Sequence, residues 1–120
     1  MPSALVSHLL SPTPDGVGAA LADDVAFHSP FADYTGRETI AGLFAVMPGV
    51  FDEIAVLREL HGADGELVTV LHGRVGDHAA DAVLDERRDA DGRVRDAMLL
   101  VRPLGAAQEA IRRMGDLLRA

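Results

Sequence analysis

The 120-residue sequence contains no cysteine, lysine, asparagine or tryptophan. Without cysteine, the fold cannot rely on disulfides, and neither a thiolate nucleophile nor a cysteine-ligated metal site is available. Without lysine, the strongly basic side chains are all arginines, and Schiff-base chemistry on a side-chain amine is excluded. Any catalysis must therefore come from histidine, aspartate, glutamate, serine, threonine, arginine or the single tyrosine, Tyr34.

Positive charge is also scarce, because the net charge is −8 and the acidic residues are scattered along the chain. This balance argues against a nucleic-acid partner and against an anionic membrane surface, both of which favour a basic face. No apolar run approaches the roughly 20 residues of a membrane span, and the N-terminus lacks a basic leader region. We expect one cytoplasmic domain spanning residues 1–120, since the length fits a single domain and the lack of cysteine suits a reducing compartment.

Three helices are predicted before the middle of the chain. An apolar stripe over residues 3–10 predicts a short helix with Ser3 as its cap. A second short helix is predicted to begin at Asp15, although nearby glycines weaken it. The third is amphipathic, and the spacing of Thr35 and Glu38 predicts a capping box at its start.

A short strand is predicted between the second and third helices. Residues 25–29 form an apolar run that Pro30 ends, because proline cannot continue a strand ladder. Side chains alternate across a strand, so Phe27 and Ser29 share one face and His28 lies on the other.

Four strand-like runs with turn signals between them fill most of the second half. They cover residues 51–60, 66–75, 78–88 and 93–102, and they predict an antiparallel meander followed by a helix from Pro103. The apolar stripe of that helix is predicted to consist of Leu104, Ala107, Ile111, Met114 and Leu118. Helices packed on one face of a curved antiparallel sheet make an α+β domain with its pocket between the two layers. The last strand is apolar on both faces, which predicts helices on one side and a second subunit or sheet on the other.

Two stretches resemble the nuclear transport factor 2-like superfamily. The first is Leu21-Ala22-Asp23-Asp24-Val25-Ala26-Phe27-His28-Ser29-Pro30 with Tyr34-Thr35-Gly36-Arg37 opening a helix, and the second is Asp89-Ala90-Asp91-Gly92-Arg93-Val94 leading to Val101-Arg102-Pro103-Leu104. Within the superfamily the chain is most similar to the SnoaL-like, polyketide cyclase and ketosteroid isomerase group, over about residues 15–118. The resemblance implies a cone-shaped, cystatin-like α+β barrel that is usually dimeric and holds a small apolar ligand.

The acid groups of the ketosteroid isomerases are missing at the matching positions. Ser29 stands where those enzymes carry the basic aspartate, and Leu84 takes the place of the acid in their oxyanion hole. Their oxyanion tyrosine has no counterpart in residues 3–10. The arginine–aspartate set of the limonene epoxide hydrolases is incomplete, because Arg74 could match the arginine but Gly76 replaces the aspartate.

The remaining candidates for proton transfer are histidines. Counting back from the Gly76 turn, His72 shares a strand face with Val68 and Val70, and the resemblance makes this the pocket face. A histidine there could act as acid or base near neutral pH; the alternatives are a hydrogen-bonded core histidine or one facing the dimer partner. His28 is the second candidate, provided that the strand end twists it inward. The expected pocket lining is Phe27, Ser29, Tyr34, Phe44, Val68, Val70, Leu84, Leu99 and Val101.

Other charged groups have less definite roles. The length of the hairpin loop after His72, two or three residues, decides which face carries Asp81. On the face of His72 it could form a histidine–carboxylate pair; on the opposite face it would only add surface charge. A metal site from His72, His78 and Asp81 can be drawn, but nothing fixes its geometry, so no metal or cofactor is expected. Arg112 and Arg113 are expected to solvate the last helix.

Three functional hypotheses remain at this point. The first is an isomerase, cyclase or lyase that moves a proton with His72 or His28 while Ser29 or Tyr34 hydrogen-bonds the developing oxyanion. The second is a non-catalytic domain that binds a small apolar or oxygenated molecule, and the third is a dimeric protein-interaction domain. All three are compatible with a homodimer formed through the outer sheet face.

Overall fold

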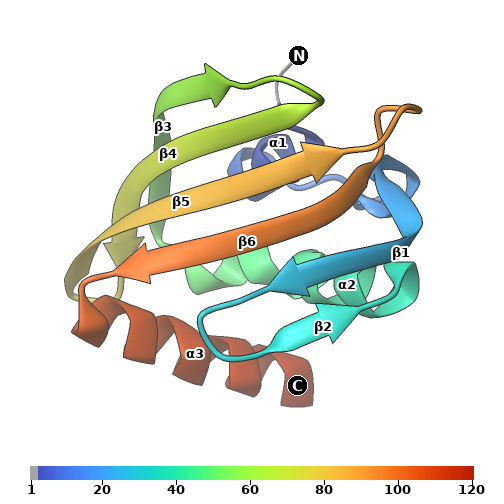
Figure 1. The fold of residues 1–120 in the computed structure, drawn as a ribbon. Helices are drawn as coiled ribbons and strands as arrows, with labels where there is room; N and C mark the ends of the chain where they lie inside the picture. Colours follow the sequence, from blue (N-terminus) through green and yellow to red (C-terminus); the bar gives the residue numbers. More distant parts are fainter. Residues whose placement is uncertain (1–2) are drawn as a thin grey trace.

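The structure is a computed structural model that describes residues 3–120 as a curved six-stranded sheet packed against three α-helices (Figure 1). The strands are β1 (Leu21–His28), β2 (Asp33–Thr35), β3 (Glu53–His61), β4 (Glu66–Val75), β5 (His78–Arg88) and β6 (Val94–Arg102). The helices are α1 (Ala4–Leu10), α2 (Arg37–Val46) and α3 (Leu104–Arg119), with 3-10 turns at Gly18–Ala20 and Met47–Val50. The predicted α+β fold is confirmed.

The sheet is open and mixed. Its strand order is β2-β1-β6-β5-β4-β3, so the predicted meander from β3 to β6 is present, with antiparallel neighbours throughout. β1 departs from the all-antiparallel prediction, because it runs parallel to β6 and antiparallel to the short β2. We call the helix-covered side the inner face and the opposite side the outer face.

Alternation along the strands assigns each residue to one of these faces. Buried Leu71, Leu84 and Leu99 lie on the inner face of β4, β5 and β6. Their neighbours along the strands, including Val70 and Leu100, lie on the outer face. A loop of only two residues joins β4 to β5, and this fixes the register between the two strands.

The core lies between the inner face and the helices. Phe27 of β1 and Phe44 of α2 meet edge to face with their ring centroids 5.3 Å apart. The buried stripe of α3 is displaced from the prediction: Ala106 and Ala110 are buried, whereas Leu104 is 72 % exposed. Small alanine side chains let this helix lie close to the sheet, and its larger apolar residues lie beside that contact line.

Two local predictions at the first helices and strands are wrong. Thr35 and Glu38 form no capping box, because Thr35 pairs with Ala26 in the sheet and Gly36, with φ of 97°, is the residue before α2. The helix expected from Asp15 is reduced to the turn Gly18–Ala20. Ser3 does cap α1 as predicted, since its hydroxyl accepts a hydrogen bond from the Val6 N–H at 3.0 Å.

No helix within residues 3–120 is both long enough and apolar enough to cross a membrane.

Candidate functional site

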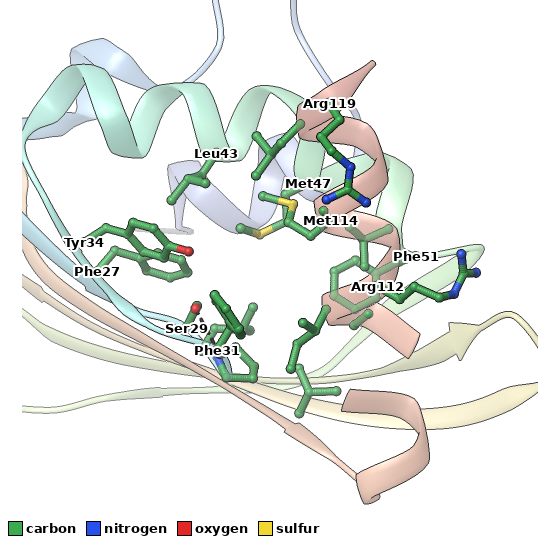
Figure 2. Close-up of a pocket in the computed structure, with 18 residues that line it drawn as sticks. Phe27, Ser29, Phe31, Tyr34, Leu43, Met47, Phe51, Arg112, Met114 and Arg119 are labelled. Carbon is green, nitrogen blue, oxygen red and sulfur yellow. Dashed lines mark hydrogen bonds between the residues drawn. The ribbon is translucent and has the colours of Figure 1, made fainter. Parts of the chain in front are cut away.

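A cavity of about 350 Å³ lies between the inner face of the sheet and α3 (Figure 2). Its walls come from the β1–β2 segment, the end of α2 with the turn that follows it, β6, and α3. The lining residues are Phe27, Ser29, Pro30, Phe31, Tyr34, Leu43, Met47, Val50, Phe51, Leu99, Val101, Ala110, Ile111, Arg112, Met114, Gly115, Leu118 and Arg119. The surface offered to a ligand is therefore mostly aliphatic, aromatic and thioether.

Five of the expected lining residues lie in this wall: Phe27, Ser29, Tyr34, Leu99 and Val101. Phe44 and Leu84 do not line the cavity, because both are completely packed in the core beside it. Val68 and Val70 lie on the outer face, since the inward side chains of β4 are those of Leu67, Thr69 and Leu71.

His72 lies on the outer face, which corrects its predicted place in the pocket. It does share a face with Val68 and Val70, but that face is turned away from the helices. Its side chain is 53 % exposed, and Nδ1 lies 2.8 Å from Asp81 Oδ1. Arg102 donates to the other carboxylate oxygen at 2.7 Å. The hydrogen bond from His72, and then that from Arg102, lower the pKa of Asp81.

His28 also lies on the outer face, so the twist that would turn it inward does not occur. Its Nδ1 is 2.8 Å from Asp33 and its Nε2 is 3.0 Å from Asp96, which links β2, β1 and β6. The hydrogen bond to Asp33, followed by that to Asp96, raises the pKa of His28. With both ring nitrogens facing carboxylates, this histidine is an ion-pair partner and has no contact with the cavity.

Ser29 lines the cavity, but its hydroxyl is already fully used. It donates to the Ala32 carbonyl at 2.9 Å and accepts from the N–H groups of Phe31 and Ala32 at 3.1 and 3.0 Å. A hydroxyl has one proton to give, so Ser29 cannot also donate to a ligand oxygen. Its role is to shape the turn that brings Phe31 to the cavity mouth.

Tyr34 supplies the polar group inside the cavity. Cross-strand pairing of Phe27 with Tyr34 places both rings on the inner face, and Figure 2 shows the phenolic oxygen directed into the hollow. No residue in the described part of the chain hydrogen-bonds this hydroxyl. No strand was predicted here, because a strand of only three residues, Asp33–Thr35, has too little pattern to be recognised.

Two arginines stand at the rim instead of only solvating α3. Arg112 contacts Glu109 at 2.7 Å and Asp116 at 2.8 Å, and Arg119 contacts Asp116 at 2.7 Å. The hydrogen bond from Arg112 lowers the pKa of Glu109. Both guanidinium groups are thus held by carboxylates of their own helix and remain largely exposed.

Arg113 instead fastens α3 to the turn before β3. It donates to the Val50 carbonyl at 3.1 Å and to Asp52 at 3.0 Å. The hydrogen bond from Arg113, together with that from the Gly76 N–H, lowers the pKa of Asp52. This contact fixes the position of the helix that forms one cavity wall.

Several lining residues were not anticipated, among them Phe31, Met47 and Phe51. Their sequence signal was weak, because each lies in or next to a turn. The predicted apolar stripe of α3 did contain a usable signal, since its members Ile111, Met114 and Leu118 all line the cavity. Among residues 3–120, no three histidine or acidic side chains come together as a metal site, so the drawn set of His72, His78 and Asp81 does not form one.

Comparison with known proteins places the chain in a family. No protein-family profile and no curated protein matches it. Among solved structures, a steroid delta-isomerase from Pseudomonas aeruginosa is 30 % identical, with 96 % of this chain and 84 % of that chain covered and a TM-score of 0.84. The fold is shared by a protein with a cystatin-like fold from Silicibacter pomeroyi DSS-3, which is 23 % identical, with 87 % of this chain and 74 % of that chain covered and a TM-score of 0.81. It is also shared by a nuclear transport factor 2-like protein of unknown function from Burkholderia xenovorans LB400, which is 17 % identical, with 88 % of this chain and 86 % of that chain covered and a TM-score of 0.68.

The chain belongs to the nuclear transport factor 2-like family. Its cavity differs from a general acid–base site, because the lining includes no histidine, aspartate or glutamate. The chemistry that this nuclear transport factor 2-like cavity offers is burial of apolar surface together with a hydrogen bond that the unpaired Tyr34 hydroxyl can donate. The two arginines of the lining lie at the rim and are bound to carboxylates of α3.

Proposed function

We propose that this nuclear transport factor 2-like protein binds a small apolar organic molecule carrying one oxygen acceptor, and that Tyr34 donates a hydrogen bond to that oxygen. The observation that supports the proposal is the hydroxyl of Tyr34, which faces a mostly apolar cavity and has no partner among the described residues. Few, well-placed polar groups in an apolar lining are typical of small-molecule sites.

Binding is favoured over proton transfer because the cavity offers no proton acceptor. A general base must lie within hydrogen-bond reach of the proton that it removes. His28 and His72 were the candidates, and both pair with aspartates on the far side of the sheet. The hydroxyl of Ser29 is occupied by its own turn. Inside the cavity a ligand therefore meets apolar contacts and the Tyr34 hydroxyl, with the carboxylate-bound Arg112 and Arg119 at the rim.

A matched pair of ligands tests this assignment. 2-Acetylnaphthalene and 2-ethylnaphthalene have similar apolar bodies, but only the first carries a carbonyl oxygen. We expect the ketone to bind the wild type more tightly by about 2- to 10-fold, which corresponds to one net hydrogen bond. Isothermal titration calorimetry with both compounds, on wild type and Tyr34→Phe, measures this difference.

The variant should remove the preference without removing binding. In Tyr34→Phe, the affinity for the ketone is expected to fall to that for the hydrocarbon. The affinity for the hydrocarbon should be the same in the variant and the wild type. Ile111→Trp, which adds bulk to the cavity wall from a partly exposed position, should weaken both compounds. Failure of both compounds to bind, or equal binding by wild type and Ile111→Trp, would show that the cavity is not the site.

Isomerase-type chemistry is a second candidate because of the 30 % identity to the steroid delta-isomerase. Such an activity would have to use Tyr34 as its acid and a base from outside the described lining. Incubation with a steroid ketone whose double bond can move into conjugation, followed by ultraviolet absorbance, tests this candidate. We expect no turnover above that of Tyr34→Phe; turnover that needs Tyr34 would establish the isomerase instead.

We further propose that the protein forms a homodimer through the outer face. An apolar centre there includes Val70, Val83, Met98 and Leu100, and Leu100 is 52 % exposed. Charged rows border this centre on both sides. One row contains His72, Asp81 and Arg102. On the other side Asp85 and His28 flank Met98, and the row beyond them contains Arg87 and Asp96. A surface that carries an apolar centre and both charge signs can be complementary to a second copy of itself.

The same substitution, leucine to aspartate, at two different positions tests the dimer. Leu100→Asp puts a charge in the centre of the outer face, and we expect a monomer by multi-angle light scattering at micromolar concentration. Leu104→Asp is the control, because Leu104 is more exposed and lies at the start of α3. A wild-type monomer would contradict the proposal, and so would a Leu100→Asp dimer.

A further inference from the structure

A buried carboxyl group lies on the inner face away from the cavity. Glu86 of β5 is 1 % exposed and stands between Leu67 of β4 and Ala97 of β6 in the sheet register, and both of these neighbours are buried. Its Oε2 atom is buried and has no hydrogen-bond partner. A charged carboxylate in such a place is costly unless it is paired, so the geometry favours the neutral acid.

A second unpaired oxygen lies on the neighbouring strand. Thr69 is completely buried, and its hydroxyl oxygen has no partner. The register places Thr69 opposite Leu84, which makes Thr69 and Glu86 diagonal neighbours on the same inner face. This part of the interior is therefore polar, and within the described residues Glu86 forms no ion pair.

The helix α1 covers this end of the sheet. Ser3, its cap, is 3 % exposed, and its hydroxyl lies beside the Glu86 carboxyl. Burial raises the pKa of Glu86 to about 7, and this effect outweighs the opposing hydrogen bond with Ser3. The other fastening of α1 is at His8, whose Nε2 lies 3.0 Å from the Phe44 carbonyl oxygen.

We propose that α1 stays seated on the sheet only while Glu86 carries its proton, so that ionisation of Glu86 releases α1 and opens this end of the core. Once α1 has moved away, the Glu86 carboxylate would be hydrated; while α1 is packed on the sheet, water cannot reach it. Release would also uncover Leu5, Val6 and Leu9, all of them buried by the closed arrangement.

Charged groups around Glu86 adjust this equilibrium without replacing it. Arg88 favours the ionised form, whereas Asp85 on the same strand and Glu59 on β3 oppose it. On α1 the titratable group is His8, whose Nδ1 accepts from the Thr13 N–H at 3.3 Å.

Hydrogen exchange read by mass spectrometry tests the proposal on the full chain. After correction for intrinsic exchange, the opening constant of residues 4–10 in the wild type should rise roughly 10- to 100-fold from pH 5 to pH 8. Residues of α3 should show no such rise. In Glu86→Gln, which keeps the shape of the neutral acid, the opening constant of α1 should be flat over the same range.

Glu59→Gln is the matched control, because it changes a nearby acid that is partly exposed, and it should keep the wild-type rise. The proposal is overturned if α1 in the wild type opens equally at pH 5 and pH 8, or opens more on acidification. It is also overturned if Glu86→Gln retains the rise. The wild-type profile decides the question even if the variant does not fold.

Discussion

The two faces of one sheet differ in what they do with polar groups. On the inner face polar side chains are few. Thr69 Oγ1 and Glu86 Oε2 have no hydrogen-bond partner, and the hydroxyl of Tyr34 has none among the described residues. On the outer face, His28 and His72 are both bound to aspartates, next to an exposed apolar centre. Unsatisfied groups therefore lie with the cavity and the core, and paired charges lie on the surface proposed to meet a second copy.

The sharpest contrast in stability is expected between one aromatic on the inner face and one leucine on the outer face. Phe27→Ala should cost about 3–5 kcal/mol in the free energy of unfolding, since it removes a fully buried ring that packs against Phe44. Leu100→Ala should change it by less than about 0.5 kcal/mol in the monomer. Urea unfolding at low protein concentration measures both, and equal costs would mean that the two faces are not distinguished in this way.

Glu86 should make the inner face sensitive to pH. Its pKa is raised to about 7 from an ordinary value of 4.5, so the folded state holds the proton more tightly than the unfolded state. Stability is therefore full below about pH 4.5, declines as pH rises from there to about 7, and stays low above it. Glu86→Gln should stabilise the protein by up to about 3 kcal/mol at pH 8 and by little at pH 4. Urea midpoints that respond equally at both pH values would remove Glu86 as the cause.

His28 should give the outer face a smaller pH dependence of stability, which arises from ion pairing and not from burial. Its pKa is raised by Asp33 and Asp96, so its contribution is complete below about pH 6.5 and is lost as pH rises through the raised value. The side chain is 37 % exposed, and exposed pairs contribute less than about 1 kcal/mol. His28→Gln should therefore cost a few tenths of a kcal/mol at pH 6 and nothing at pH 9, by thermal unfolding. A loss that is larger at pH 9 would contradict the ion-pair role.

The sequence predicted the frame of the fold well because its signals there were local. The ranges 66–75 and 78–88 coincide with β4 and β5, since turns that contain glycine bound the two strand-like runs. Parity was also correct: His72 does share its face with Val68 and Val70, and His28 does lie opposite Phe27. The parallel neighbour of β1 was missed, because the pairing of distant strands leaves no local pattern.

The candidate site was harder to predict, because alternation does not say which of two faces meets the helices. β4 carries Val68 and Val70 on one face and Leu67 and Leu71 on the other, and both faces look apolar in sequence. Choosing the wrong one moved His72 from the surface into the pocket. The hydrogen bonds that occupy Ser29 come from a turn backbone, which residue types alone do not reveal.

Three of the four methionines offer a direct test of where a ligand binds. Met47 and Met114 line the cavity, whereas Met98 lies on the outer face, pairing with Asp85 across the sheet. Methyl NMR of protein labelled with [methyl-13C]methionine and titrated with 2-acetylnaphthalene reads the two faces at once. We predict saturable shifts at Met47 and Met114 and none at Met98. Saturable shifts at Met98 alone would contradict the assignment of the cavity as the binding site.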